Sequence, residues 1–214
     1  MNFSHLKVST RLTWSFGIIL ALLLAIGALG LYGLQRSNDA LRTVYEDRTV
    51  SMAQLDTIVR ALLRNRLAVA NSVLEPSADH IARNTADIDT NVALIGKTWA
   101  EYMATYLTPE EKTLAERFEA SREAFVREGL NPAVVALRAG DIKGAQTLVV
   151  EKIRPLFAGA SDGIDALIKL QVDVAQKEYE AAQARQTTLR ALVIGMTVLA
   201  LVLGASMAWL IIAS

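Results

Sequence analysis

The sequence contains no cysteine, which excludes disulfide bonds, thiolate metal sites and thioether attachment of haem. Its 22 basic residues balance 22 acidic ones, and no lysine and arginine run marks a nucleic-acid surface. The two histidines, His5 and His80, lie far apart in the chain, so no histidine pair is available for a metal. There is also no phosphate-binding glycine loop and no nucleophile motif. We therefore expect no cofactor, no metal, no nucleic-acid partner and no enzymatic activity.

Acidic residues are absent from both ends of the chain, where the two longest uncharged runs lie. Leu12–Leu34 and Ala191–Ala213 are each 23 residues long and carry no charge. A helix of that length measures roughly 35 Å, enough to cross a hydrocarbon core of about 30 Å. We predict transmembrane helices at residues 12–34 and 191–213, on either side of a polar segment at residues 35–190.

The charges beside the first apolar run predict its orientation. Residues 1–11 carry Lys7 and Arg11 without any acid, whereas basic and acidic residues are mixed after residue 34. The positive-inside rule therefore predicts a cytoplasmic N-terminus at residues 1–11 and an outer segment at residues 35–190. A cleaved signal peptide is the alternative, but the length of the run and the lack of a small-residue cleavage site disfavour it.

Three turn signals divide the outer segment into four predicted helices. Glu75–Ser77 contains a proline that disfavours helix in the residue before it. Thr108–Glu111 combines a threonine cap, a proline at the first helical position and a glutamate that closes a capping box. Arg138–Asp141 supplies a glycine that ends one helix and an aspartate that caps the next. We interpret Glu111 as part of a solvated helix start.

Apolar residues recur at helical spacing in all four segments, which is typical of bundle core. They are Leu41, Val44, Leu55, Ile58, Leu62, Val69 and Val73 in the first; Ile81, Ile88, Val92, Ile95 and Trp99 in the second; Leu114, Phe118, Phe125, Val134 and Leu137 in the third; and Val149, Ile153, Phe157, Ala160, Ile164, Leu167, Ile168 and Val174 in the fourth. Gly129–Pro132 predicts a break or kink, and Pro155 a local hinge. The pattern predicts an all-α fold, an up-down-up-down antiparallel four-helix bundle continuous with the two transmembrane helices.

A short basic N-terminus, a span, a four-helix outer segment and a second span form a recognisable order. Together with Leu41–Leu55, Ile58–Ala70 and Ala136–Asp141, this order resembles the sensory part of bacterial methyl-accepting chemotaxis proteins. The resemblance implies a chemoreceptor module that crosses the inner membrane twice and exposes residues 35–190 to the periplasm. It also implies cytoplasmic signalling partners, reached through a region absent from this chain. The small residues Ala200, Gly204 and Ala208 form a ridge on the second span that suits close helix packing, which predicts a homodimer.

Two alternatives remain open. Membrane histidine kinases and cyclic-dinucleotide enzymes can carry similar outer bundles. A membrane scaffold or adaptor that binds another protein and no small molecule is the second alternative.

Three arginines are the main candidates for a binding site. Arg60 and Arg64 are one helical turn apart and project from one face, away from the predicted core. Arg64 lies 12 residues before Pro76 and Arg154 lies 14 residues after Gly140, which predicts similar heights in an antiparallel bundle. Because guanidinium groups bind carboxylates bidentately, these arginines predict a small carboxylate ligand, either an organic acid or an amino acid.

Five further residues are candidate ligand contacts. Thr147 shares a helix face with Arg154, Asn65 and Arg66 flank the arginine pair, and Trp99 and Tyr102 could line a pocket. Aromatic residues at this spacing are more often core, and exposed arginines are more often solvated or paired. In the aspartate receptors that the chain resembles, arginines from the first helix bind the ligand between two protomers. Their spacing is not reproduced here, so aspartate is not carried over as the ligand.

Overall fold

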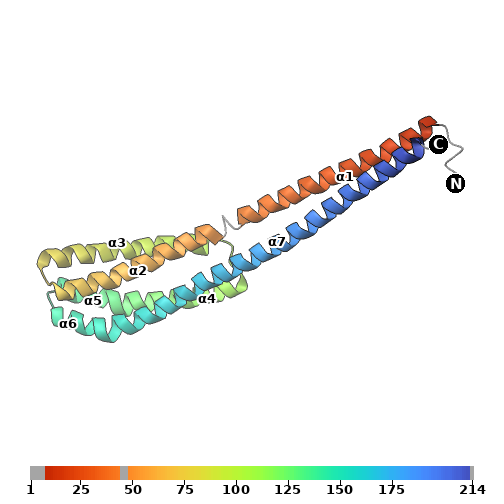
Figure 1. The fold of residues 1–214 in the computed structure, drawn as a ribbon. Helices are drawn as coiled ribbons and strands as arrows, with labels where there is room; N and C mark the ends of the chain where they lie inside the picture. The colour runs from red at the N-terminus through yellow and green to blue at the C-terminus, as the bar shows by residue number, and fades with distance from the viewer. Residues whose placement is uncertain (1–7, 44–47, 213–214) are drawn as a thin grey trace. The chain divides into compact units, whose positions relative to one another are not determined.

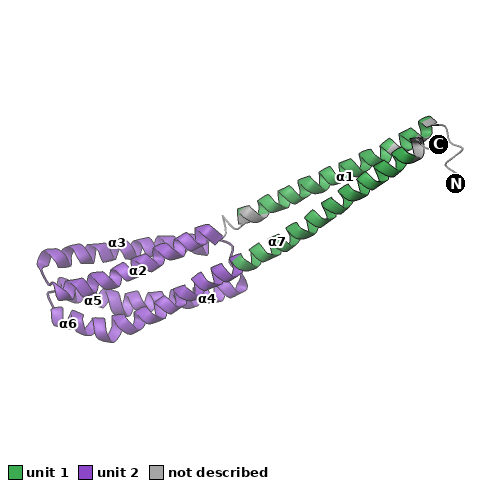
Figure 2. Ribbon diagram, viewed as in Figure 1, with its two compact units in different colours: residues 1–43, 176–214 green, residues 44–175 purple. Residues whose placement is uncertain are grey.

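The computed structural model describes residues 8–43 and 48–212, and these residues form helices joined by short turns. The predicted all-α fold is confirmed. Residues 1–7, 44–47 and 213–214 lie outside the described part, as do the predictions made for Lys7, for Val44 and for the side chain of Leu41. The chain divides into two compact units (Figure 2), Met1–Thr43 with Gln176–Ser214, and Val44–Ala175.

The second unit contains the predicted four-helix bundle (Figure 1). Its first two helices are α2 (Val50–Leu74) and α3 (Ala78–Met103). The third consists of α4 (Pro109–Ala124), η3 (Phe125–Leu130) and α5 (Asn131–Arg138), and the fourth of α6 (Ile142–Leu148), η4 (Val149–Ile153) and the start of α7 (Arg154–Ile212). The three turns lie where the sequence predicts them. The fourth helix runs on without interruption to Ile212. Helix α1 spans Val8–Thr43, and residues 44–47 lie outside the described part of the chain.

Capping explains where these helices begin. The Ser77 hydroxyl accepts a hydrogen bond from the His80 amide at 3.4 Å, and Thr108 and Glu111 form the predicted capping box. Gly140 adopts a positive φ of 75°, which a side chain would disfavour, and Asp141 accepts from the Gly144 amide at 2.8 Å. Local chemistry therefore fixes the start of three of the four bundle helices.

The predicted break at Gly129–Pro132 and the predicted hinge at Pro155 are π-turns. In η3 the amide of Asn131 donates to the Val126 carbonyl, and in η4 the amide of Arg154 donates to the Val149 carbonyl. Both bonds span five residues rather than four, and both precede a proline. Proline has no amide hydrogen and its ring crowds the preceding turn, so a wider turn lets the chain remain helical.

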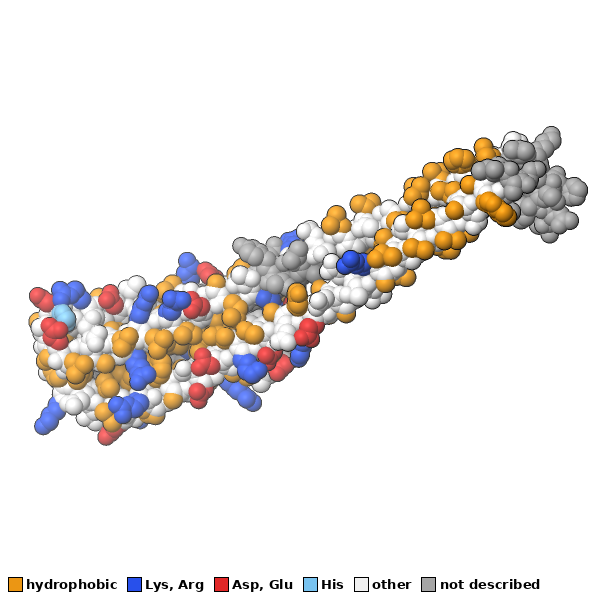
Figure 3. All heavy atoms as spheres, viewed as in Figure 1, with side chains coloured by type: hydrophobic (Ala, Val, Ile, Leu, Met, Phe, Trp, Pro, Cys, Tyr) orange, Lys and Arg blue, Asp and Glu red, His pale blue; other side chains and the backbone are white. Residues whose placement is uncertain are grey.

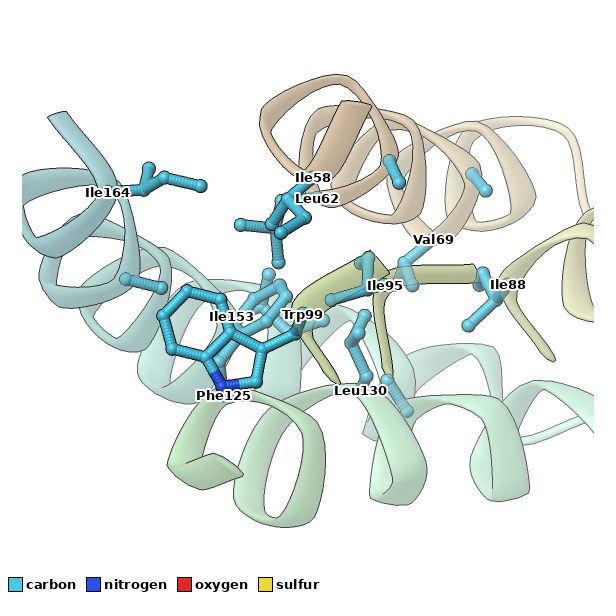
Figure 4. Packing of buried hydrophobic residues seen from close by; sticks show 14 of the residues in the cluster. Ile58, Leu62, Val69, Ile88, Ile95, Trp99, Phe125, Leu130, Ile153 and Ile164 are labelled. Carbon is cyan, nitrogen blue, oxygen red and sulfur yellow. The ribbon is translucent and has the colours of Figure 1, made fainter. Parts of the chain in front are cut away.

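The predicted apolar stripes form a continuous core (Figure 4). Leu62 from α2, Ile95 from α3, Phe125 from η3 and Ile164 from α7 are all buried in it. The other predicted stripe residues with described side chains are buried as well, except that Val73, Val92, Leu114, Val149, Phe157, Ile168 and Val174 are only partly buried. With no cysteine in the chain, this burial is the main source of stability in the bundle.

The first unit pairs α1 with the last part of α7. A Cβ atom on Gly33 would lie 3.5 Å from Leu189, and one on Gly204 would lie 3.6 Å from Ile19, so the two helices run antiparallel. By length and composition both helices can cross a membrane, and their apolar windows are not buried. On the face shown in Figure 3, hydrophobic side chains gather on part of this unit, whereas charged side chains are spread over the bundle.

Neighbouring leucines on α2 test the core assignment. Leu62 is 2% exposed and Leu63 is 42% exposed. We expect Leu62→Ala to lower the free energy of unfolding by about 2–5 kcal/mol because it leaves a cavity. Leu63→Ala should change the free energy of unfolding of the monomeric chain by no more than about 0.5 kcal/mol. Urea denaturation followed by circular dichroism measures both, and equal losses would contradict the assignment.

Candidate functional site

Arg60 and Arg64 both lie exposed on α2, on the side away from the core. The Arg60 guanidinium donates to the Asp56 carboxylate at 2.7 Å, and this hydrogen bond raises the pKa of Arg60. Both partners are more than half exposed, and such surface pairs contribute little stability. The Asp56 contact can therefore be exchanged for a ligand carboxylate at low cost.

Exposed leucines lie on the same side of α2 as these arginines. Leu63 is 42%, Leu67 is 58% and Leu74 is 82% exposed. Residues 60, 63, 64, 67 and 74 fall on one side of a helix with 3.6 residues per turn. We call the surface formed by Arg60, Leu63, Arg64 and Leu67 the outer face of α2. It combines cations with apolar area that the bundle does not cover.

Arg154 and Thr147 are exposed on the fourth helix, and the Thr147 hydroxyl donates to the Lys143 carbonyl at 3.1 Å. Arg66 of α2 reaches toward this helix, and its guanidinium lies 4.8 Å from the centre of the Phe157 ring. Arg64 is two residues earlier and so points about 200° away around the helix. Within one chain, the structure therefore brings Arg66 rather than Arg64 to the helix that carries Arg154.

The Arg66 contact is part of the packing between helices. The Phe157 ring meets Phe125 edge-on, with 5.8 Å between ring centres. A cation over an aromatic ring contributes about 0.5–1 kcal/mol at exposed sites. Arg66 therefore joins α2 to α7, in addition to carrying positive charge at the surface.

Asn65 lies in the core rather than beside a surface site. Its side chain is fully buried, and neither its amide nitrogen nor its amide oxygen has a hydrogen-bond partner among the described residues. A buried polar group without a partner costs about 1–3 kcal/mol. Asn65 is therefore a source of strain in the interior of the bundle.

Trp99 and Tyr102 are also buried, as the alternative of core aromatics predicts. Their rings stack with 5.3 Å between centres, and Trp99 meets Phe118 edge-on at 4.8 Å. Such pairs add about 0.5–1.5 kcal/mol beyond the area they bury. In this conformation neither ring is accessible to a ligand at the surface.

A buried polar network surrounds Glu111, and the interpretation of Glu111 as solvated is wrong. Its carboxylate accepts hydrogen bonds from the Tyr102 hydroxyl at 2.6 Å, from the Gln171 amide and from the Thr108 backbone amide at 3.4 Å. The Arg48 guanidinium lies 4.0 Å from it and donates to the Gln171 carbonyl oxygen at 3.2 Å. The capping box explains the burial, because it turns the glutamate back over the start of α4.

The network connects all four helices of the bundle. Arg48 lies just before α2, Tyr102 on α3, Glu111 on α4 and Gln171 on α7. Burial, and then the hydrogen bond to Glu111, raise the pKa of the Tyr102 hydroxyl well above its ordinary value. One sequence signal could have revealed the network, because Gln171 continues the spacing of the core residues Ile164 and Leu167.

The match to a known family is extensive. Residues 2–175 match the family model described as Tar ligand binding domain homologue. The chain belongs to this family. One relative, the methyl-accepting chemotaxis protein NahY of Pseudomonas putida, is 25% identical over 200 residues, which are 89% of this chain and 36% of NahY. The chain thus spans about a third of the length of that relative. No solved structure matches the chain.

Family membership confirms the predicted likeness to methyl-accepting chemotaxis proteins. The chain corresponds to the periplasmic sensory portion of these receptors, and its role in chemotaxis is sensory. The family is one of non-enzymatic sensory domains.

The raised pKa of Tyr102 predicts how the bundle responds to alkaline pH. The folded state favours the neutral hydroxyl, so the unfolded chain releases this proton first, near the ordinary tyrosine pKa of about 10. The stability from this group is present below about pH 10 and is lost as the pH rises further. Thermal melts from about pH 8 to about pH 11 should show a steeper loss in the parent chain than in Tyr102→Phe.

Tyr106→Phe is the matched control, because Tyr106 is exposed. It should keep the pH profile of the parent chain. An unchanged profile in Tyr102→Phe would contradict the role given to the buried hydroxyl.

Proposed function

We propose that this chemoreceptor module senses a small carboxylate-bearing attractant, either an organic acid or an amino acid. The ligand binds at the outer face of α2, where Arg60 and Arg64 supply guanidinium groups one turn apart. The observation that carries the proposal is that both arginines are exposed beside uncovered leucines. Each guanidinium group can donate two parallel hydrogen bonds to the carboxylate of the ligand. The exposed leucines beside them favour contact with a second protein surface.

The second surface is the same face of another copy of the chain. A two-fold axis across the outer face would bury Leu63 and Leu67 of both protomers. It would also bring two pairs of arginines together, and a bound carboxylate offsets their repulsion. Arg154 and Thr147 are exposed on the fourth helix and remain separate candidate contacts, because within one chain Arg64 does not face that helix. The proposed ligand does not contact Asn65, Arg66, Trp99 or Tyr102. The first of these and the two aromatic residues are buried, and Arg66 packs against Phe157.

The membrane arrangement is part of the same proposal. Residues 1–11 are cytoplasmic, residues 12–34 and 191–213 cross the inner membrane, and residues 35–190 lie in the periplasm. The two apolar helices support this arrangement. Ligand binding shifts packed helices by about 1–2 Å, and α7 carries the shift toward the cytoplasm. Because NahY extends well beyond the matched region, signalling partners are reached through further segments of a longer receptor.

Thermal melting of the whole chain in detergent, with a panel of dicarboxylates, tricarboxylates, aromatic acids and amino acids, tests the ligand class. A ligand at 100 times its dissociation constant stabilises the folded state by about 2.7 kcal/mol. We expect one carboxylate class to raise the melting temperature, and Arg60→Ala and Arg64→Ala to abolish that rise.

Arg83→Ala is the matched control, because Arg83 is exposed on α3 and its removal changes the net charge equally. An equal loss in Arg83→Ala would assign the effect to bulk charge. No stabilisation by any member of the panel would favour the scaffold or adaptor alternative.

The absence of cysteine makes the proposed dimer easy to test. Cysteine introduced at Leu67, on the outer face, should form a disulfide between protomers on oxidation of the membrane-embedded chain. Cysteine at Val135, exposed on α5, should not. Non-reducing electrophoresis distinguishes the disulfide-linked dimer from the monomer. Equal crosslinking at both positions would indicate random collision and contradict an interface at the outer face.

A further inference from the structure

Two hydrogen-bond donors on neighbouring helices of the bundle are buried without a partner. Trp99 of α3 is 3% exposed, and its indole nitrogen Nε1 has no hydrogen-bond partner among the described residues. The same holds for the guanidinium nitrogen Nε of Arg122 on α4, whose side chain is 16% exposed. A donor that has lost its water without gaining an acceptor destabilises the folded state. A ligand that supplies acceptors to both donors would remove this cost.

Helices α3 and α4 bring the two donors to nearly the same height. The Tyr102 hydroxyl donates to Glu111 across the two antiparallel helices at 2.6 Å, and the Trp99 ring meets Phe118 edge-on. Arg122 follows Phe118 by one turn, and because helical side chains lean toward the N-terminus, it leans back toward the level of that contact. Trp99 leans toward the N-terminus of the opposite helix, and therefore toward the level of Arg122.

An open space adjoins the two donors. Gly96 precedes Trp99 by three residues on α3, and a Cβ atom placed on it would meet no atom within 4 Å. Gly96 also follows Asp89 by seven residues, which is about two turns. The Asp89 carboxylate accepts from Arg138 of α5 at 2.6 Å, so Gly96 lies on the side of α3 that faces the third bundle helix. The absent side chain leaves room on the side toward which the indole leans.

The two donors and the space beside them fit a small carboxylate. A guanidinium group and an indole nitrogen donate hydrogen bonds and accept none. A carboxylate carries two acceptor oxygens and a charge opposite to that of Arg122. Because the space corresponds to one absent side chain, we expect formate and acetate to fit and tricarboxylates to be excluded.

One acidic side chain competes for Arg122. The Glu119 carboxylate is 41% exposed and lies 3.8 Å from Nη2 of Arg122, which is too far for a good hydrogen bond. Exposed pairs of this kind are held weakly. Glu119 therefore lowers the affinity of the site for an anion without occupying the Nε donor.

We propose that Arg122 and Trp99 form a second carboxylate site, between α3 and α4, for the smallest monocarboxylates. One carboxylate oxygen accepts from the Arg122 guanidinium and the other from Nε1 of Trp99. Both nitrogens are covered in this conformation, so the Arg122 side chain turns outward to admit the ligand, while the Trp99 ring keeps its contact with Phe118. This site lies away from the outer face of α2 and does not depend on the proposed function.

Nuclear magnetic resonance of the whole chain in detergent, with isotope-labelled tryptophan, tests the site. The chain has three tryptophans, Trp14, Trp99 and Trp209, and Trp99→Phe identifies the indole signal of Trp99. We expect sodium acetate to move that signal until it saturates, because the indole hydrogen gains an acceptor. Sodium chloride at equal ionic strength should leave the signal in place.

Arg122→Ala should abolish the response to acetate. Arg117→Ala is the matched control, because Arg117 is exposed on the same helix and its removal changes the net charge equally. Gly96→Leu keeps both donors and fills the space, so it should abolish the response as well. Thermal melts establish that each variant is folded, and Gly96→Leu keeps the test decisive if Arg122→Ala does not fold.

Glu119→Gln should have the opposite effect. It removes the competing charge, so the dissociation constant for acetate should fall about 1.5-fold to 5-fold, the range expected for an exposed pair. A purely structural role of Arg122 predicts no such change.

A Trp99 signal that acetate does not move, or that moves equally in sodium chloride, would overturn the site. An unchanged response in folded Arg122→Ala or Gly96→Leu would do the same. Arg60→Ala and Arg64→Ala should keep the acetate response, which separates this site from the outer face of α2. If acetate moves the Trp99 signal and no acid of the larger panel stabilises the chain, this site is supported and the outer-face site is not. The reverse result supports the outer-face site alone.

Discussion

The buried carboxylate of Glu111 constrains how the four helices of the bundle meet. A charge in the interior is tolerated only when hydrogen bonds and an opposite charge replace water. Here the Tyr102 hydroxyl, the Gln171 amide and the Arg48 guanidinium do so, and they come from α3, from α7 and from the residues just before α2. Because displacement of any one helix removes a partner, the network fixes their register where the chain enters and leaves the bundle.

The middle of the bundle has the opposite character. Two π-turns pack against each other, and Asn65 keeps a buried amide without a partner among the described residues. A hydrogen-bond network therefore holds one end of the bundle, whereas the middle contains a buried amide without hydrogen-bond partners among the described residues. A shift of α7 must also move Gln171, whose hydrogen bonds to charged groups are worth about 1.5–3 kcal/mol each. Coupling energies between sites are about 1–3 kcal/mol, so a bound ligand can supply energy on the scale that the network opposes.

Local chemistry made the fold predictable, and long-range geometry limited prediction of the site. The Thr108 capping box and Gly140 have effects set by a few adjacent residues, and the apolar spacing reports burial directly. The height of Arg154 could be counted from the turns. The direction in which Arg154 projects around its helix could not be predicted. The structure brings Arg66, rather than Arg64, to the helix that carries Arg154. Glu111 was misread because its cap role is local while its burial depends on Tyr102 and Gln171 from distant segments.

In the proposed dimer, the outer face of α2 links ligand binding to assembly. Two arginine pairs facing each other across a two-fold axis repel, by about 3 kcal/mol for unit charges 6 Å apart at an effective dielectric constant of about 20. The burial of Leu63 and Leu67 opposes that repulsion. A carboxylate between the arginines turns repulsion into attraction, so ligand strengthens the dimer. By linkage the dimer must then strengthen ligand binding by the same factor. A sensor built this way responds to ligand and to its own concentration in the membrane through one surface.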